Sequence, residues 1–395
     1  MAKLKIGLKQ HTPLIHFQSE QPGAILRATE VKSKLDKFLK KYAFPGGFEE
    51  YKQYLIGYKT DKKDKIEDFG DKQAFDYKLR IYTENPNKIQ KINIKGGMQA
   101  LYFAGRSNNG NVKGILTNED IILEFFTFHK GLMEIIKNNI EGFFCINNFG
   151  TRQNKGFGSF YLKKPINEVD KLIDGICTHD KTNIYLNIKY NKGDYFQIFE
   201  DISVIYPLMK SGLNFPKWPK SYHKSFLFKY MLNKDIGNEK RFIKENFFSP
   251  WKRIENDNKE KRYVRAMLGI CDGIEFRDSE RTGKVKYNSN IERFQSPILF
   301  KIINNELFII PKKIPKEMFY NKFKFSNEFK SGRESKVNKE IIYTPKEDEF
   351  NLENFLSGFA DYFNNHIKVS NVNNVFENKI RKAKLRRIDI KQVVK

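Results

Sequence analysis

The sequence predicts an α+β protein of two domains. A chain of 395 residues exceeds the roughly 250–300 residues at which one hydrophobic core stops growing. Apolar periodicity gives the order β-α-β-β-α-β up to residue 165, and the pattern changes after Pro165. That order is the ferredoxin-like arrangement, which RNA-recognition modules share. We therefore expect two ferredoxin-like (RRM-like) domains with helical insertions, over residues 1–165 and 166–395.

The first domain shows two kinds of apolar spacing. Leu4, Ile6 and Leu8 alternate with lysines, as in a strand with one buried face. Apolar residues over 31–42 fall at helical spacing, and a Pro-Gly-Gly run follows them. Residues 49–73 are charged and poorly periodic, which indicates an insertion. The predicted elements are strand 3–9, helix 31–42, strand 76–83, a short extra strand 88–95, strand 121–128, helix 132–140 and strand 159–162.

The second domain mixes helices, strands and a basic end. Two apolar segments flank Asn304-Asn305, which predicts a hairpin. Residues 312–349 are basic and are expected to be irregular. The basic cluster over 379–387 either lies along RNA or forms a solvated helix. The predicted elements are strand 184–190, helices 198–209, 225–232, 240–247 and 262–268, hairpin strands 293–301 and 307–310, and helix 352–363.

The net charge indicates a polyanionic partner. Lysine and arginine number 72 against 47 acidic residues, a formal charge of +25. Such a surface attracts phosphate backbones by counterion release, so nucleic acid is the leading partner. The 36 phenylalanines and 19 tyrosines include faces on which bases could stack, although most must be core. An AT-rich gene would also raise the lysine, asparagine and isoleucine content, and this alternative stays open.

Several site classes are not supported. Cys145, Cys177 and Cys271 lack the paired spacing of a zinc site or a disulfide framework, so we expect no metal and no cofactor. The charged N-terminus does not fit a signal peptide, and no apolar run approaches transmembrane length. We expect a cytoplasmic protein without a membrane partner.

A glycine-rich basic loop lies at the end of the first domain. Residues 149–162 read Phe-Gly-Thr-Arg-Gln-Asn-Lys-Gly-Phe-Gly-Ser-Phe-Tyr-Leu and lead into a strand. Glycines let backbone N–H groups approach an anion, and the basic residues neutralise phosphates. The Gly-Lys-Ser/Thr ending of a nucleotide-binding loop is absent, and a basic hairpin turn is the alternative. The candidate RNA contacts in the loop are Arg152, Gln153, Asn154, Lys155, Gly156 and Phe157. Phe157 either stacks on a base or is buried under the sheet.

Three segments together resemble a known superfamily. They are Thr12-Pro13-Leu14 with Leu26-Arg27-Ala28-Thr29-Glu30-Val31-Lys32, then Gly150-Thr151-Arg152-Gln153-Asn154-Lys155-Gly156-Phe157-Gly158-Ser159, then Arg293-Phe294-Gln295-Ser296-Pro297-Ile298. In this order they resemble the RAMP superfamily of CRISPR proteins, and they are most similar to the first RAMP subunit of the type III-B Cmr effector complex.

The resemblance implies ferredoxin-like folds and a place in a ribonucleoprotein that targets foreign RNA, an antiviral defence. It implies a non-catalytic subunit that binds CRISPR RNA near its 3′ end, beside other RAMP subunits and possibly target RNA. The further candidate RNA contacts are His16, Arg27, Lys32, Arg106 in a polar loop, and Arg293. Arg27 and Lys32 would contact phosphate at a helix start, unless Glu30 simply pairs with a lysine on a solvated face.

Two other functions stay open. The first is a metal-independent endoribonuclease that processes pre-CRISPR RNA, with His11 or His16 as acid or base. Against it, the glycine-rich loop lies mid-chain, whereas the processing enzymes carry theirs near the C-terminus. In the superfamily that the chain resembles, subunits that cut target RNA use an aspartate in the loop after the first strand. The corresponding segment 16–26 offers Glu20 but no aspartate, which argues against cutting of target RNA. The second is a stand-alone RNA-binding protein that serves another ribonucleoprotein.

Overall fold

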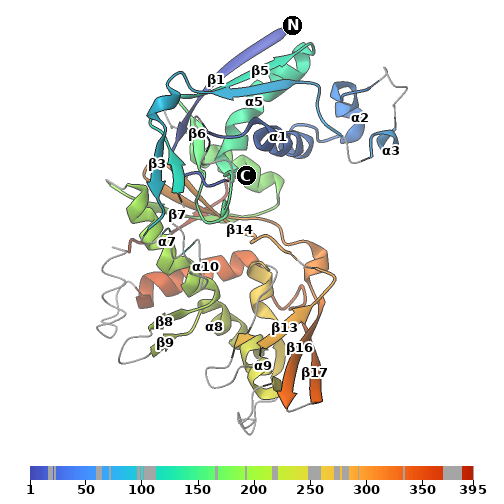
Figure 1. Ribbon diagram of the computed structural model, residues 1–395, viewed down its shortest axis with the longest axis vertical. Helices are drawn as coiled ribbons and strands as arrows, with labels where there is room; N and C mark the ends of the chain where they lie inside the picture. Colours follow the sequence, from blue (N-terminus) through green and yellow to red (C-terminus); the bar gives the residue numbers. More distant parts are fainter. Residues whose placement is uncertain are drawn as a thin grey trace.

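The three largest β-sheets of the described residues follow one another along the long axis of the molecule (Figure 1). The structure is a computed structural model. It describes the chain except residues 17–20, 22–23, 59–64, 71–72, 96–97, 99–100, 102–112, 165–167, 192–193, 216–220, 248–258, 271–275, 278–283, 292, 332–333, 368–384 and 395. Within the described part, no helix is long and apolar enough to cross a bilayer.

The first sheet is antiparallel and has the order β2-β5-β1-β6. In β1 the lysines Lys3, Lys5 and Lys9 are exposed while Leu8 is buried, so the alternation in the sequence sets the buried face. The predicted element order β-α-β-β-α-β is confirmed. Its members are β1 (Ala2–Gln10), α1 (Ala28–Tyr42), β2 (Lys78–Tyr82), β5 (Ile121–Thr127), α5 (Lys130–Ile146) and β6 (Phe160–Leu162).

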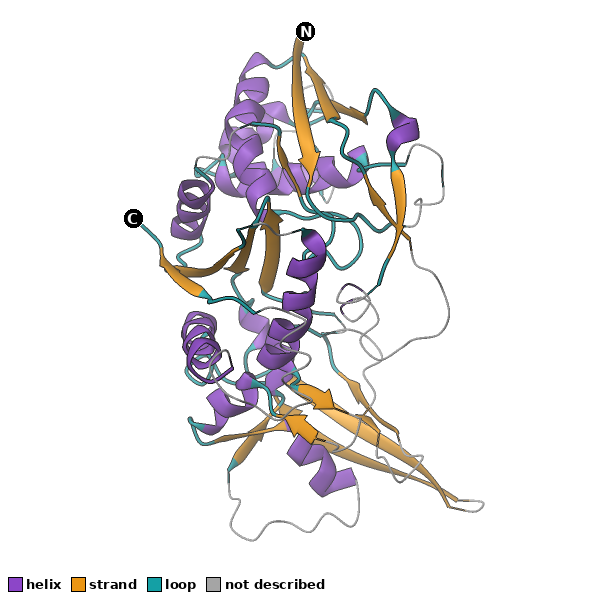
Figure 2. Ribbon diagram, turned by 90° about the vertical axis from the view of Figure 1, so that its left-hand side faces the viewer, coloured by secondary structure: helices purple, strands orange, loops and turns teal. Residues whose placement is uncertain are grey.

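Helices α1 and α5 cover one face of this sheet (Figure 2). Val31, Leu35 and Leu39 of α1 are fully buried, as their helical spacing predicts. The extra strand expected at 88–95 is β3 (Gln90–Asn93), which pairs with β4 (Lys113–Leu116) outside the four-stranded sheet. The insertion at 49–73 contains two short helices among its described residues, α2 (Phe48–Tyr51) and α3 (Ile66–Phe69).

The second sheet repeats this strand order. If the strands of each sheet are numbered in chain order, the order of neighbouring strands in both sheets is second, third, first, fourth. The hairpin predicted around Asn304 is confirmed, and Asn304 adopts a φ of 51° in its turn. The elements are α6 (Val169–His179), β7 (Ile184–Lys189), α7 (Tyr195–Lys210), β14 (Ile298–Ile303), β15 (Glu306–Pro311), α10 (Leu352–Tyr362) and β18 (Asp389–Gln392), with order β14-β15-β7-β18.

Both faces of this middle sheet are buried. In β14, Leu299 and Ile303 pack into the core of the first half, whereas Phe300 and Ile302 pack into the core of the second half. Every residue of β14 is buried for this reason. The middle sheet therefore lies between two hydrophobic cores and contributes side chains to both.

The third sheet was only partly foreseen. Residues 312–349 were expected to be irregular, and this was wrong, because a long antiparallel hairpin runs from Lys322 to Tyr343. Residues 262–268 were expected to be helical, but they hold the end of a strand and the 3₁₀ turn Val264–Leu268. The elements of this region are β8 (Leu213–Phe215), β9 (Ser221–His223), α8 (Phe226–Leu232), β10 (Ile236–Asn238), α9 (Glu239–Phe247), β11 (Glu260–Arg262), β12 (Phe276–Arg277), β13 (Lys284–Asn288), β16 (Lys322–Ser331) and β17 (Glu334–Tyr343).

Candidate nucleic-acid interface

The glycine-rich loop connects the two cores. Phe149 and Phe160 at its ends belong to the first core. Phe157 belongs to the second core, where its ring centroid lies 4.5 Å from that of Phe199. Because aromatic anchors on both sides fix it, the loop is a rigid junction between the halves of the protein.

Two glycines are required by the path of this loop. Gly158 has a φ of 64°, and a Cβ there would lie 1.9 Å from the carbonyl oxygen of Phe149. Gly150 has a φ of 75°, and a Cβ there would lie 2.5 Å from the carbonyl oxygen of Ile15. Both positions combine a left-handed backbone with close backbone approach, so the glycines shape the loop.

The Thr-Pro-Leu segment clamps one side of the loop. Thr12 Oγ1 donates to the carbonyl of Gly156 at 2.7 Å and accepts from the N–H of Ser159 at 2.8 Å. The N–H of Gly158 donates to the carbonyl of Pro13 at 2.9 Å. Thr12 is fully buried, so its hydroxyl is committed to these bonds.

The segment 293–296 holds the other side. Asn154 Nδ2 donates to the carbonyl of Ser296 at 2.8 Å, and Gln295 Nε2 donates to Asn154 Oδ1 at 2.9 Å. The N–H of Phe300 donates to the carbonyl of Asn154 at 3.1 Å. The structure therefore brings together the loop 149–159, the segment 12–15 and the segment 293–296. We call this contact zone the seam.

Helix α1 contributes an ion pair to the seam. Glu30 Oε1 accepts from the N–H of Gly150 at 2.9 Å and from Lys34 Nζ at 2.9 Å. Lys34 Nζ also donates to the carbonyl of Asn148 at 2.7 Å and to Gln153 Oε1. A protein carboxylate thus holds the N–H of Gly150, where the sequence suggested that an anion could be held. Lys34 was not predicted, although its i,i+4 spacing from Glu30 was a usable signal.

Two predicted arginines face solvent at the seam. Arg152 and Arg293 are both exposed. Each lies two residues from one partner of the Asn154–Gln295 hydrogen bond, so the fold joins two segments that carry exposed positive charge. Arg27 is half-buried at the start of α1, where its charge adds to the effect of burial in lowering the pKa of His16. For these three arginines, phosphate contact stays a prediction that their positions allow.

Other predicted contacts are used inside the protein. Phe157 is fully buried, which agrees with the second of its two predicted roles and not with stacking on a base, and Gly156 is buried as well. Lys32 Nζ donates to the carbonyl of Phe75 at 2.8 Å and lies 3.6 Å from the ring centroid of Tyr77. In this structure Lys32 makes its contacts within the first half of the protein, and phosphate contact through this residue stays a prediction.

The loop lysine and its polar neighbours are also structural. Lys155 Nζ donates to the carbonyl of Leu101 at 3.2 Å and lies 4.5 Å from the ring centroid of Tyr206. Gln153 and Asn154 make the bonds to Lys34 and to the segment 293–296. Arg106 and the tail residues 379–384 lie outside the described residues.

The two candidate acid-base histidines are poorly suited to proton transfer. Burial lowers the pKa of His11 to about 3, aided by the nearby Lys301 and Lys9 charges. His11 Nδ1 accepts from the N–H of Asn304 at 3.1 Å. His16 is buried, and burial followed by the Arg27 charge lowers its pKa. Both imidazoles are neutral at pH 7 and enclosed, which opposes a role as general acid.

A buried lysine joins the two ends of the loop. Lys301 Nζ on β14 donates to the carbonyls of Asn147 and Phe160, each at 2.9 Å. Burial lowers the pKa of Lys301 to about 7. Cys145, whose charge when ionised would oppose this shift, is itself held neutral because burial raises its pKa to about 12. Lys301 was not predicted, because it lies within an apolar strand.

The described residues contain no group of three or more histidines, cysteines, aspartates or glutamates that could hold a metal ion. Cys145 and Cys177 are buried free thiols, and Cys271 lies outside the described residues. Within this part of the chain, the seam offers positive charge and hydrogen bonds.

Comparisons with known proteins point to one family. The family model for the Cmr1 N-terminal domain matches residues 1–213, and that for the Cmr1 C-terminal domain matches residues 222–382. The crystal structure of apo Cmr1 from Pyrococcus furiosus is 9% identical, covers 80% of this chain and 90% of its own, and gives a TM-score of 0.40. A chain of the cryo-EM structure of type III-B Cmr-beta bound to cognate target RNA is 10% identical, covers 41% of this chain and 58% of its own, and gives a TM-score of 0.27. No curated protein matches the sequence.

Proposed function

The chain belongs to the Cmr1 family of type III-B RAMP subunits, and we propose that it binds CRISPR RNA without cutting it. In this proposal it occupies the end of the Cmr effector complex that holds the 3′ part of the CRISPR RNA. Its partners are the neighbouring RAMP subunits and, during targeting, the target RNA.

The observation that carries the proposal is the seam. Three segments that lie far apart in the sequence meet there, and their contacts are satisfied by buried groups such as Thr12 and Asn148. The exposed Arg152 and Arg293 are left on the outside of this rigid frame. Fixed arginines on a chain of charge +25 are suited to hold an RNA backbone in a set position.

The strand order supports the fold that this function implies. Both four-stranded sheets read second-third-first-fourth, and each carries helices between its first and second and its third and fourth strands. We therefore infer two ferredoxin-like domains, with the third sheet and helices α8 and α9 as an insertion in the second.

The surroundings of the histidines support a non-catalytic role. Cleavage at a 2′-hydroxyl needs a base and an acid that reach the RNA, with pKa values near the working pH. A pKa of about 3 leaves His11 neutral and a weak base, and the Asn304 N–H occupies its Nδ1.

The test is to purify the tagged protein gently from cells that carry its own locus, and to identify the proteins and RNA that accompany it. We expect other RAMP subunits and short CRISPR RNAs with defined 3′ ends. Recovery with unprocessed precursor RNA alone, together with cleavage of that RNA in a metal-free assay, would replace the proposal with a processing endoribonuclease. Recovery with unrelated RNAs and without RAMP subunits would indicate a different ribonucleoprotein.

A further inference from the structure

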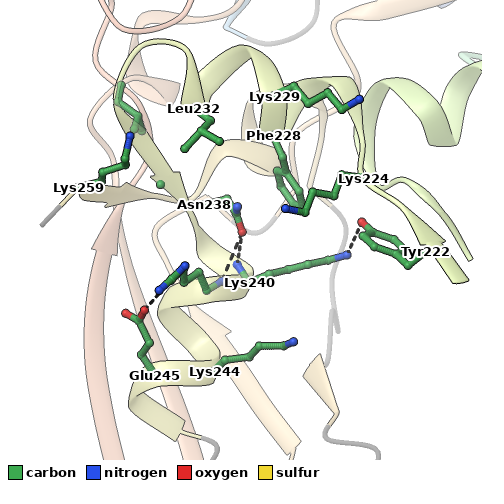
Figure 3. A pocket seen from close by; sticks show the side chains of 13 residues that line it. Tyr222, Lys224, Phe228, Lys229, Leu232, Asn238, Lys240, Lys244, Glu245 and Lys259 are labelled. Carbon is green, nitrogen blue, oxygen red and sulfur yellow. Dashed lines mark hydrogen bonds and ion pairs between the residues drawn. The ribbon is translucent and has the colours of Figure 1, made fainter. Parts of the chain in front are cut away.

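A pocket lies away from the seam, between helices α8 and α9 (Figure 3). It encloses about 420 Å³, within the range of roughly 300–1,000 Å³ that small-ligand sites occupy. Phe228, Leu232 and Ile236 give it an apolar wall. Leu232 is 50% exposed and Tyr222 is 43% exposed, so the pocket presents apolar and aromatic surface to solvent.

The rim of the pocket is strongly basic. Its only carboxylate among the described lining residues, Glu245, is neutralised by Arg241 at 2.7 Å and by Lys261 at 3.2 Å. Six basic side chains line the pocket: Lys224, Lys229, Lys240, Arg241, Lys244 and Lys259. The net charge therefore favours an anionic ligand.

The position of Lys240 links the charge to the aromatic rings. Its ammonium donates to the hydroxyl of Tyr222 at 3.0 Å and lies 4.7 Å from the centroid of that ring. It also lies 5.5 Å from the ring centroid of Phe228. Figure 3 shows Lys240 extending along the pocket to Tyr222 and Lys224 extending beside Phe228. An aromatic ring and several ammonium groups thus line the same opening.

Burial is the main cause of an unusual pKa at this site. Burial, and then the Arg265 charge, lower the pKa of Lys240 to about 8, with Lys244 acting in the same direction and Glu239 against it. Burial raises the pKa of Tyr222 above its ordinary value, so the phenol stays neutral. An anion beside Lys240 would therefore raise the pKa of this amine and favour its charged form.

We propose that this pocket holds one unpaired nucleotide of bound RNA, with the base against the exposed ring of Tyr222 and the adjoining phosphates on Lys224, Lys240 and Lys244. The proposal rests on RNA binding as the function of the chain. RNA fits better than an acidic peptide, because a base supplies a planar face for the rings and each nucleotide brings its own phosphate.

The test measures binding of the full chain to a fluorescein-labelled single-stranded RNA by anisotropy over a series of salt concentrations. Tyr222→Ala should weaken binding about 5- to 150-fold, the range for loss of one stacked base, with an unchanged salt slope. Tyr222→Phe keeps the ring and should bind like the parent. Lys224→Ala with Lys244→Ala should reduce the slope of log Kd against log salt by about 1.4, from about 0.7 per lost phosphate contact on single strands. The exposed Lys137 on α5 gives a control for the loss of one surface charge away from the pocket, and Lys137→Ala should leave the slope unchanged.

A second measurement needs no variant at this site. RNA that carries 4-thiouridine is cross-linked to the parent protein by light, and the modified peptides are mapped. We expect a cross-linked peptide that contains Tyr222 or Phe228. Full affinity of Tyr222→Ala, or cross-links confined to other segments, would overturn the pocket while leaving RNA binding intact. Amine-specific cross-linking of Lys224 or Lys244 to a neighbouring subunit in the purified complex would assign the pocket to a protein partner instead. A parent protein that binds no RNA would overturn the proposed function itself.

Discussion

The buried Lys301 makes stability depend on pH in a specific way. Its pKa is about 7 in the folded protein, against about 10.4 for a lysine in an unfolded chain. Between these values the unfolded state binds more protons, so the free energy of unfolding rises with pH by up to about 1.4 kcal/mol per pH unit. Lys301→Met removes this term, and the stability of the parent relative to the variant should grow by about 2–3 kcal/mol between pH 7.5 and 9.5. Urea unfolding of both proteins at several pH values measures the difference.

Subtracting the variant isolates Lys301 from other groups. In the folded protein the nearby Cys145 and His11 titrate outside this range, at about 12 and about 3, and their titration in the unfolded state is common to the parent and the variant. The variant also leaves the carbonyls of Asn147 and Phe160 without their donor, which lowers its stability by an amount that does not change with pH. Lys137→Met, on the exposed face of α5, should show no such trend. A difference between parent and Lys301→Met that stays constant across pH would refute the argument, because it would mean that burial does not shift this amine.

Three further results are expected. Arg152→Ala with Arg293→Ala should flatten the salt dependence of RNA binding by about 1.4 in slope, and an unaltered slope would remove the seam from the RNA interface. Affinity for single-stranded RNA should fall as the pH rises from 7 to 9, because Lys240 loses its charge near pH 8, whereas Lys240→Arg should keep its affinity, and parallel pH profiles would contradict this. Gly158→Ala should destabilise the protein by more than about 2 kcal/mol in urea unfolding, because its φ is 64° and a carbonyl oxygen lies 1.9 Å from the added carbon. The control is Gly175→Ala, in a helix with open space around it, which should be neutral or stabilising.

Patterns that depend on neighbouring residues in the sequence predicted the fold well. Alternation in β1 and helical spacing in α1 identified their buried faces, since those faces follow from local geometry alone. The hairpin of β16 and β17 was missed although Phe323 and Phe325 alternate with lysines and are fully buried. The density of basic residues there concealed a period-2 pattern that was present.

The roles of individual lysines could not be predicted in the same way. An ammonium group donates equally well to a phosphate or to a backbone carbonyl, and only the tertiary neighbours decide between them. Lys32 and Lys155 looked like RNA contacts, yet they donate to the carbonyls of Phe75 and Leu101. The three motif segments were correctly singled out, but nothing in their spacing showed that they touch one another.

The shared middle sheet determines how the chain can be divided. A fragment that ends at residue 213 keeps β7 but loses β14 and β15, and with them Leu299, Ile303 and Phe308 from its own core. Unfolding of either half would expose the apolar side chains on one face of the remaining sheet to water. The two halves should therefore unfold together in a single calorimetric transition, and neither should persist as an independent module. The chain topology therefore divides the protein into two parts, but we expect these two parts to fold and unfold as one cooperative unit.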